Sequence, residues 1–191
     1  LNHIAYRIPA GHRLRLSISN AYWPLIWPSP YQDTLTLQLA ESRLSLPCST
    51  SLEINNNPAL AEFDPKELPT ASVLRSGNTQ KTIKEDPGTG LVEIRIKTDY
   101  GHFWHRSCDT EVDFTIDQLL SIYPDDPDSA KSETDLQVKM KQGKTETALS
   151  SHYEMTSSQQ YYFVRATWQA WAGDECIFER EFDEKIERKL I

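Results

Sequence analysis

The stretch Ile8–Pro30, which reads IPAGHRLRLSISNAYWPLIWPSP, constrains the fold most, because its two halves demand different backbone geometry. Residues Arg13–Ser19 alternate between apolar and polar side chains, which is the period of a half-buried β-strand. Trp23-Pro24 and Trp27-Pro28 follow, and each proline fixes its own φ and favours extended geometry in the residue before it. We therefore expect a strand at Arg13–Ser19, and at Tyr22–Pro30 a stiff extended segment that is neither helix nor central strand.

The part of this stretch from Tyr22 to Pro28, here called the Trp–Pro segment, carries three large aromatic rings. Burying three rings of about 150–250 Å² each, at about 25 cal/mol per Å², corresponds to at most about 10–15 kcal/mol. That rivals the net stability of about 5–15 kcal/mol of a whole domain, so we expect the rings to lie against protein, in this domain or another. We predict an interface formed by Tyr22, Trp23, Pro24, Leu25, Ile26, Trp27 and Pro28.

The rest of the chain predicts an all-β fold. Alternating stretches occur at Thr34–Leu39, Arg43–Leu46, Leu91–Thr98, Val112–Ile122, Asp135–Lys141, Thr145–Ser151, Tyr161–Trp171 and Cys176–Phe182. Each has one apolar and one polar face, which is typical of antiparallel sheets packed face to face. We predict one β-sandwich domain over residues 1–191, with a long irregular excursion at about 49–82, a chain reversal at Tyr100-Gly101 and a charged tail or short helix from Asp183 to Ile191.

Composition narrows the classes of partner. The net charge of −8 argues against a nucleic-acid or anionic-membrane surface. No apolar run approaches the roughly 18 residues of a membrane span. The three cysteines, Cys48, Cys108 and Cys176, are odd in number and scattered along the sequence. This favours a reducing compartment and a cytoplasmic location over a disulfide framework, although a single disulfide between two of them remains an alternative. The chain enters on a strand-like pattern at Leu1, so we expect it to be a piece of a longer polypeptide.

No motif in the sequence predicts a reaction. None of the seven glycines provides the G-x-S-x-G of a serine nucleophile elbow, and no local signature joins Ser, His and Asp into a triad. The ligand-type residues His102, His105, Cys108 and Asp109 are candidates for a metal site, but residues three apart on a strand point to opposite faces, so we interpret them as polar loop residues. We likewise interpret the acidic run at 125–128 as a solvated turn rather than a calcium loop, and predict no cofactor.

The first 30 residues carry a family resemblance. Tyr6–Leu16, Ser17–Ser19 and Tyr22–Pro30 resemble the C-terminal non-catalytic domain of the X-Pro dipeptidyl-peptidase, cocaine esterase and α-amino-acid ester hydrolase group. Weaker support comes, in chain order, from Leu44–Pro47, Ser121–Ala130 and Phe178–Phe182. The resemblance thus spans essentially the whole chain, and its first block is the most specific.

The resemblance implies a jelly-roll sandwich of galactose-binding-like type, attached to an α/β-hydrolase domain that bears the Ser-Asp-His triad. None of that triad falls in the matched part, so no catalytic residue is expected here. In the family several strands precede the block matching Leu1–Gly11, which implies that this chain is the later part of the domain. The expected partners are the catalytic domain and a second subunit. A stand-alone carbohydrate-binding module and an independent hydrolase are the alternatives.

Overall fold

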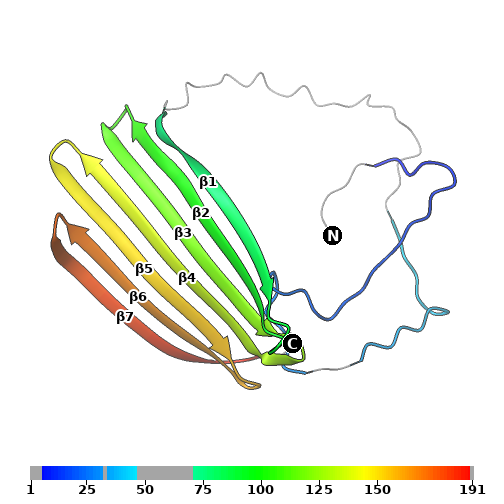
Figure 1. Cartoon of the computed structure of the whole chain (residues 1–191). Helices are drawn as coiled ribbons and strands as arrows, with labels where there is room; N and C mark the ends of the chain where they lie inside the picture. Colours follow the sequence, from blue (N-terminus) through cyan, green and yellow to red (C-terminus); the bar gives the residue numbers. More distant parts are fainter. Residues whose placement is uncertain (1–5, 32–33, 47–70, 190–191) are drawn as a thin grey trace.

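The computed structural model describes residues 6–31, 34–46 and 71–189. Its regular structure is one antiparallel sheet of seven strands, in which each strand pairs with the next one along the chain (Figure 1). The strands are β1 (Ala71–Glu85), β2 (Val92–His105), β3 (Thr110–Tyr123), β4 (Asp126–Gln142), β5 (Thr145–Ser157), β6 (Tyr161–Ala172) and β7 (Glu175–Glu187). The described residues contain no helix, and hence no helix that is long and apolar enough to cross a membrane.

The all-β prediction is confirmed, and the strands predicted after residue 90 lie within β2–β7 except for Leu91, which precedes β2. The jelly-roll topology expected from the resemblance does not appear, because these seven strands follow one another in a simple up-and-down order. Gly143 and Gly173 adopt φ values of +59° and +58° in two of the tight turns between strands, a region that glycine enters without steric cost. The turn predicted at Gln142-Gly143-Lys144 is confirmed.

Three predicted boundaries are wrong. Residues 71–82 of the expected excursion belong to β1, while 49–70 lie outside the described residues. The expected tail from Asp183 continues β7 as far as Glu187. The expected reversal at Tyr100-Gly101 is a β-bulge, where the register with β3 shifts between Asp99 and Gly101 and the strand then continues.

Close backbone approach explains the glycines at this bulge. Gly101 has φ +96°, and a Cβ added there would lie 2.5 Å from the carbonyl oxygen of Arg75. On the neighbouring strand, a Cβ on Gly77 would lie 2.3 Å from the carbonyl oxygen of Asp99. Glycine at both positions therefore lets β1 and β2 remain paired across the bulge.

The strands predicted at Arg13–Ser19, Thr34–Leu39 and Arg43–Leu46 are also wrong, since residues 6–31 and 34–46 contain no strand in the structure. Their alternating apolar side chains are exposed, as at Leu14 and Leu39. Alternation predicts which side chains share a face, but a strand also needs a neighbour for its backbone hydrogen bonds. In Figure 1 this part of the chain departs from the strands and meets the sheet near its lower end, beside the C terminus.

The sheet has two chemically opposite faces, because alternate residues share a face and paired residues lie side by side. On β2, β3, β5, β6 and the part of β4 from Ala130 onward, one face carries no Asp, Glu, Lys or Arg, and we call it the apolar face. Its members are Val92, Ile94, Ile96, Thr98, Phe103, Val112, Phe114, Ile116, Gln118, Leu120, Ile122, Ala130, Ser132, Thr134, Leu136, Val138, Met140, Thr147, Leu149, Ser151, Tyr153, Met155, Ser157, Tyr162, Val164, Ala166, Trp168, Ala170 and Ala172. Charged residues lie on the same side at its margins, namely Asp128 on β4 and Arg180 and Glu184 on the edge strand β7.

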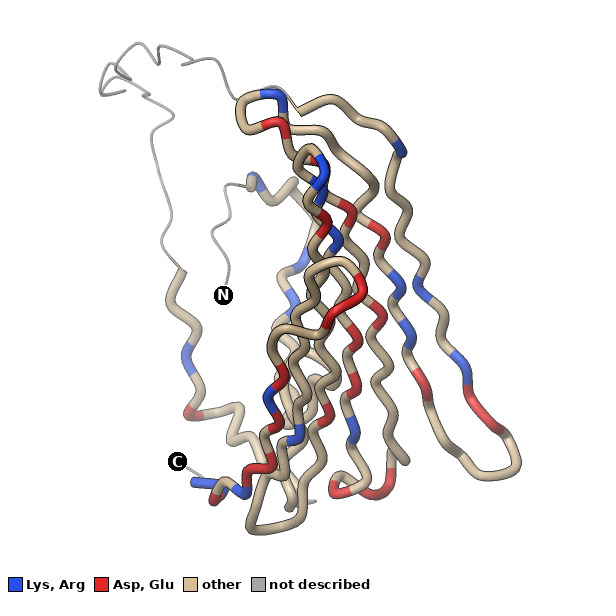
Figure 2. The backbone as a smooth tube through the Cα atoms, turned by 90° about the vertical axis from the view of Figure 1, so that its left-hand side faces the viewer, with Lys and Arg blue, Asp and Glu red and all other residues tan. Residues whose placement is uncertain are grey.

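The opposite, charged face is held by cross-strand ion pairs. Arg75 bridges Asp99 and Asp113, Arg95 Nη2 lies 2.6 Å from Asp117 Oδ2, and Lys131 Nζ lies 2.8 Å from Glu154 Oε2. Figure 2 shows Lys, Arg, Asp and Glu recurring along the strands, separated by uncharged residues. Because such pairs are largely exposed, each stabilises the fold by only about 0–1 kcal/mol.

These pairs nevertheless shift proton affinities. The hydrogen bond from Arg95 lowers the pKa of Asp117, and the hydrogen bond from Lys131 lowers the pKa of Glu154. The hydrogen bond from Arg75 does the same to the pKa of Asp99.

Candidate docking site at the Trp–Pro segment

The Trp–Pro segment lies on the apolar face, at the end of the sheet where β5 ends and β6 begins. The Nε1–H of Trp27 donates a hydrogen bond to Ser157 Oγ at 2.9 Å. The same indole packs edge-on against Tyr162, with ring centroids 6.3 Å apart, and against Trp23, with centroids 5.2 Å apart. Trp27 is therefore an anchor that joins residues more than a hundred positions apart in the sequence.

Arg188 fastens the same segment from the C-terminal end of the chain. Its side chain is 1% exposed. One guanidinium nitrogen, Nη2, donates to the carbonyl of Pro28 at 2.6 Å, and the other, Nη1, donates to the carbonyl of Ser158 at 2.9 Å. The guanidinium also stacks on the ring of Tyr162, with Cζ 4.8 Å from the centroid.

The charge of Arg188 has one acidic neighbour, Asp128, whose Oδ1 lies 3.5 Å from Nη1. Two backbone carbonyls and one carboxylate thus surround a buried cation, an arrangement that favours the planar, multidentate guanidinium over the compact ammonium of lysine. The guanidinium Nε is buried without a hydrogen-bond partner. Arg188 is therefore a structural clamp between the Trp–Pro segment and the strands β5 and β6.

The segment itself forms a turn, so the prediction of an extended conformation is wrong between Tyr22 and Ile26. The N–H of Ile26 donates to the carbonyl of Tyr22 at 3.0 Å, and the Trp23–Pro24 peptide bond is cis. A residue before proline favours either an extended or a turn conformation, and here the turn is formed. The turn directs the side chains of the segment to opposite sides.

One side of the turn faces the sheet and the other faces solvent. Trp23, Pro24, Trp27 and Pro28 are half-buried. In contrast, Tyr22, Leu25 and Ile26 are 62%, 74% and 61% exposed. The structure thus divides the predicted interface residues into an inward anchor and an outward apolar surface, which we call the outward triplet (Tyr22, Leu25 and Ile26).

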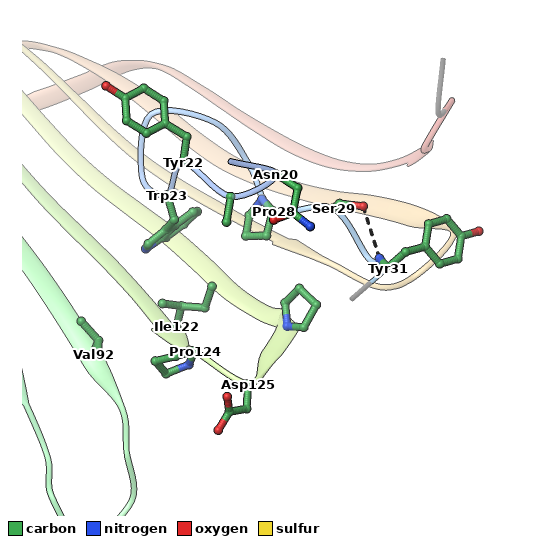
Figure 3. Close-up of a pocket in the computed structure, with 12 residues that line it drawn as sticks. Asn20, Tyr22, Trp23, Pro28, Ser29, Tyr31, Val92, Ile122, Pro124 and Asp125 are labelled. Carbon is green, nitrogen blue, oxygen red and sulfur yellow. Dashed lines mark hydrogen bonds between the residues drawn. The ribbon is translucent and has the colours of Figure 1, made fainter. Parts of the chain in front are cut away.

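A hollow of about 610 Å³ lies beside the anchor, lined by both the segment and the sheet. Figure 3 shows Trp23 between Tyr22 and the side chain of Ile122, with Pro124 and Asp125 at the edge of the hollow. The Nε1 atom of Trp23 is buried and lacks a hydrogen-bond partner. The walls are mainly aromatic rings, prolines and aliphatic side chains, so the hollow suits an apolar protein segment better than a charged ligand.

The metal-ligand candidates do not converge. His102 Nε2 contacts Glu111 Oε2 at 3.0 Å on the charged face, while Cys108 lies in the turn between β2 and β3, where its thiol approaches the carbonyl of His105 at 3.7 Å. Asp109 accepts a hydrogen bond from Trp104 Nε1 at 3.0 Å. Within the described ranges, no group of three or more His, Cys, Asp or Glu side chains is arranged to hold a metal ion.

The acidic residues at 125–128 form a backbone hydrogen bond within their own turn and an ion pair with Arg188. Asp126 Oδ1 accepts the N–H of Asp128 at 3.1 Å, and Asp128 in turn faces Arg188. Sequence reasoning did not identify Arg188, Ser157 or Tyr162 as part of the site. Arg188 lies in a run of charged residues that carries no signal for burial, and the contact becomes apparent only once β7 is placed beside β6.

Fold and site together define an all-β domain whose Trp–Pro segment is fixed on its own sheet. In the comparison with protein families, residues 1–89 match the model of the X-Pro dipeptidyl-peptidase C-terminal non-catalytic domain. The match covers the Trp–Pro segment and β1, and it confirms the resemblance for the first 89 residues. The weaker stretches at Ser121–Ala130 and Phe178–Phe182 lie outside it. Neither a curated protein nor a solved structure matches the chain.

The family match also bears on catalysis. The matched family is described as a non-catalytic domain, and the match is to residues 1–89.

Proposed function

We propose that this chain is the accessory domain of an α/β-hydrolase-type serine hydrolase, an X-Pro dipeptidyl-peptidase or a related acyl esterase, and that it packs on the catalytic domain through the outward triplet. The parent enzyme would hydrolyse an amide or an ester. The observation that carries the proposal is the exposure of Tyr22, Leu25 and Ile26 on a segment that is otherwise fixed to the sheet.

Fixation matters because it lowers the entropic cost of docking. A free loop loses conformational freedom when it binds, whereas the Trp–Pro segment is already held by Trp27 and Arg188. Exposed apolar side chains on a pre-organised turn match the anchors found at the centres of protein interfaces. The outward triplet therefore has both the chemistry and the rigidity of a docking surface.

The geometry of the two tryptophans argues against the carbohydrate-binding alternative at this place. A sugar platform needs an exposed ring face, but Trp23 and Trp27 meet edge to face at 81° and are half-buried. Both rings already pack against protein, which leaves less ring surface for stacking on a pyranose.

The test begins with the reading frame that contains Leu1. It should encode, upstream, a G-x-S-x-G serine elbow followed by Asp and His. The hydrolase domain encoded there, produced separately, should bind the 191-residue chain in isothermal titration calorimetry.

Leu25→Glu should weaken that binding by about 10–100-fold, since removing one buried leucine from an interface costs about 1.5–3 kcal/mol. Leu39→Glu is the matched control, because Leu39 is similarly exposed, at 79%, but lies outside the Trp–Pro segment. The proposal is overturned if no such hydrolase domain is encoded, or if both variants bind as tightly as the natural chain.

A further inference from the structure

The hollow beside Trp23, here called the Trp23 groove, has two walls that come from distant parts of the chain. One wall is the Trp–Pro segment with its flanking residues, and the other is the end of β3 with the turn that follows it. In Figure 3, Trp23 and Pro28 lie on the first wall, and Ile122 and Pro124 lie on the second. The volume of about 610 Å³ falls within the range of about 300–1,000 Å³ that is usual for binding pockets.

Arg188 holds the two walls at a fixed spacing. Its Nη2 atom donates to the carbonyl of Pro28 on the first wall at 2.6 Å. Its Nη1 atom lies 3.5 Å from Oδ1 of Asp128, which follows Pro127 on the second wall. The groove is therefore formed before any ligand binds, and such pre-organisation lowers the entropic cost of binding.

Aromatic rings and prolines dominate the lining of the groove. The rings are those of Tyr22, Trp23 and Tyr31, and the prolines are Pro28, Pro124 and Pro127. Aromatic-lined grooves bind proline-rich peptides in the polyproline II conformation. That conformation has no internal hydrogen bonds, so its backbone carbonyls need donors from elsewhere. Tyr22 and Tyr31 are 62% and 48% exposed, and their hydroxyl groups can donate to such carbonyls.

The outer end of the groove is acidic. Asp125 lines the groove and Asp126 follows it in the turn, and both residues are exposed. Asp128 also follows in this part of the chain, where Arg188 is its cationic partner. A ligand with a positive charge next to its apolar part matches this distribution, because complementary charges steer a partner and fix its orientation.

We propose that the Trp23 groove binds a proline-rich segment of another protein in the polyproline II conformation, with a flanking Arg or Lys of that segment beside Asp125. The prolines of the segment lie against the aromatic rings, and its carbonyls accept hydrogen bonds from the tyrosine hydroxyls. The proposal goes beyond the proposed function and does not rest on it, because the groove is complete in this chain without a hydrolase domain.

The experiment is fluorescence anisotropy with the 191-residue chain and a labelled peptide. The peptide has about ten residues, or about three turns of polyproline II. It alternates proline with leucine, ends in arginine and is acetylated at its N terminus. Such a peptide covers less area than a standard protein interface, so we expect a Kd of about 10–100 μM. A peptide with alanine in place of every proline should bind about 10-fold more weakly, because it is not pre-organised.

A reversal of charge tests the position of the basic residue. Asp125→Lys should weaken binding of the arginine-ended peptide about 5–10-fold and strengthen binding of a glutamate-ended peptide by a similar factor. Asp174→Lys is the matched control, since Asp174 is also exposed in a turn but lies at the opposite end of the sheet. Unfolding cannot produce a gain in binding, so the glutamate-ended peptide keeps the test valid even if Asp125→Lys lowers stability.

The aromatic wall is tested in the same assay. Tyr31→Ala should weaken binding about 10-fold, whereas Tyr6→Ala should not change it, because Tyr6 is 72% exposed and lies outside the groove. Equal binding of the proline and alanine peptides would overturn the proposal. So would an unchanged preference for the arginine-ended peptide in Asp125→Lys, or no binding by the natural chain up to about 1 mM.

Discussion

The clamp formed by Arg188 gives the most specific prediction about stability. Arg188→Ala removes two short charge-assisted hydrogen bonds, to the carbonyls of Pro28 and Ser158. Hydrogen bonds to charged groups contribute about 1.5–3 kcal/mol each. The substitution also leaves both carbonyls without their donor, so we expect a loss of about 3–5 kcal/mol, as found when one partner of a buried ion pair is removed.

The assay is urea denaturation of the full chain, followed by tryptophan fluorescence. With an m-value of about 2 kcal/mol per M, the expected loss moves the midpoint down by about 1.5–2.5 M. Arg165→Ala is the control, because its side chain is 68% exposed and faces Asp183 at 3.5 Å, so the change should cost about 0–1 kcal/mol. Equal midpoints for Arg188→Ala and Arg165→Ala would refute the reasoning that Arg188 fastens the segment.

Four further predictions follow from the described contacts. Trp27→Phe should lower the unfolding free energy by about 0.5–1.5 kcal/mol through loss of the indole hydrogen bond to β5, measured by the same denaturation. Gly101→Ala should destabilise the fold more than Gly143→Ala. Both residues have positive φ, but only at Gly101 do backbone atoms occupy the place of the new methyl group. Equal losses of unfolding free energy would contradict this. The pKa of Asp117 is lowered because Arg95 donates a hydrogen bond to its carboxylate. Its contribution to stability is therefore complete above the unfolded-state pKa of about 3.9 and disappears as the pH falls through the lower folded-state pKa. Asp117→Asn should flatten the decline of stability below about pH 4. Finally, the isolated chain should hydrolyse neither ester nor X-Pro amide substrates, and turnover that a single Ser→Ala change abolishes would contradict its assignment as non-catalytic.

The strands of the sheet were predictable from the sequence where they are central. In β2–β6 the apolar face must pack while the other face carries ions, so the residues alternate strictly, as they do at Asp135–Lys141. The pattern underestimated strand lengths, because β4 includes residues 126–134, which are polar, small or proline. There the backbone pairing of the neighbouring strands maintains the structure, and pairing leaves no trace in a single sequence.

The edges of the sheet were not predictable in the same way. β1 has one neighbour and is exposed along nearly its whole length, so its sequence carries little hydrophobic alternation and was assigned to an irregular excursion. The reverse error occurred at Arg13–Ser19, where alternation is strict but the described structure has no strand. Local pattern thus failed at the edge strand β1, although it identified part of the other edge strand, β7, at Cys176–Phe182.

The Trp–Pro segment shows how much of the site the sequence contained. Its composition predicted that all three rings would lie against protein. Trp27 does lie against Ser157 and Tyr162, whereas Tyr22 is 62% exposed in this chain. The division into inward and outward side chains was not predictable, because it depends on the turn between Tyr22 and Ile26. The burial of Arg188 was not predictable for a related reason. A charged residue near the end of a chain is normally solvated, and only its three-dimensional neighbours show that it is buried.

Hydroxyl-radical footprinting of the chain, alone and with the hydrolase domain of its parent protein, tests the account most directly. In the free chain the outward triplet should be oxidised readily, whereas Trp27 should react slowly because its ring lies against β5 and β6. On addition of the hydrolase domain, Tyr22, Leu25 and Ile26 should become protected while Trp27 stays unchanged. Rapid oxidation of Trp27 in the free chain, or no protection of the outward triplet in the complex, would contradict the account.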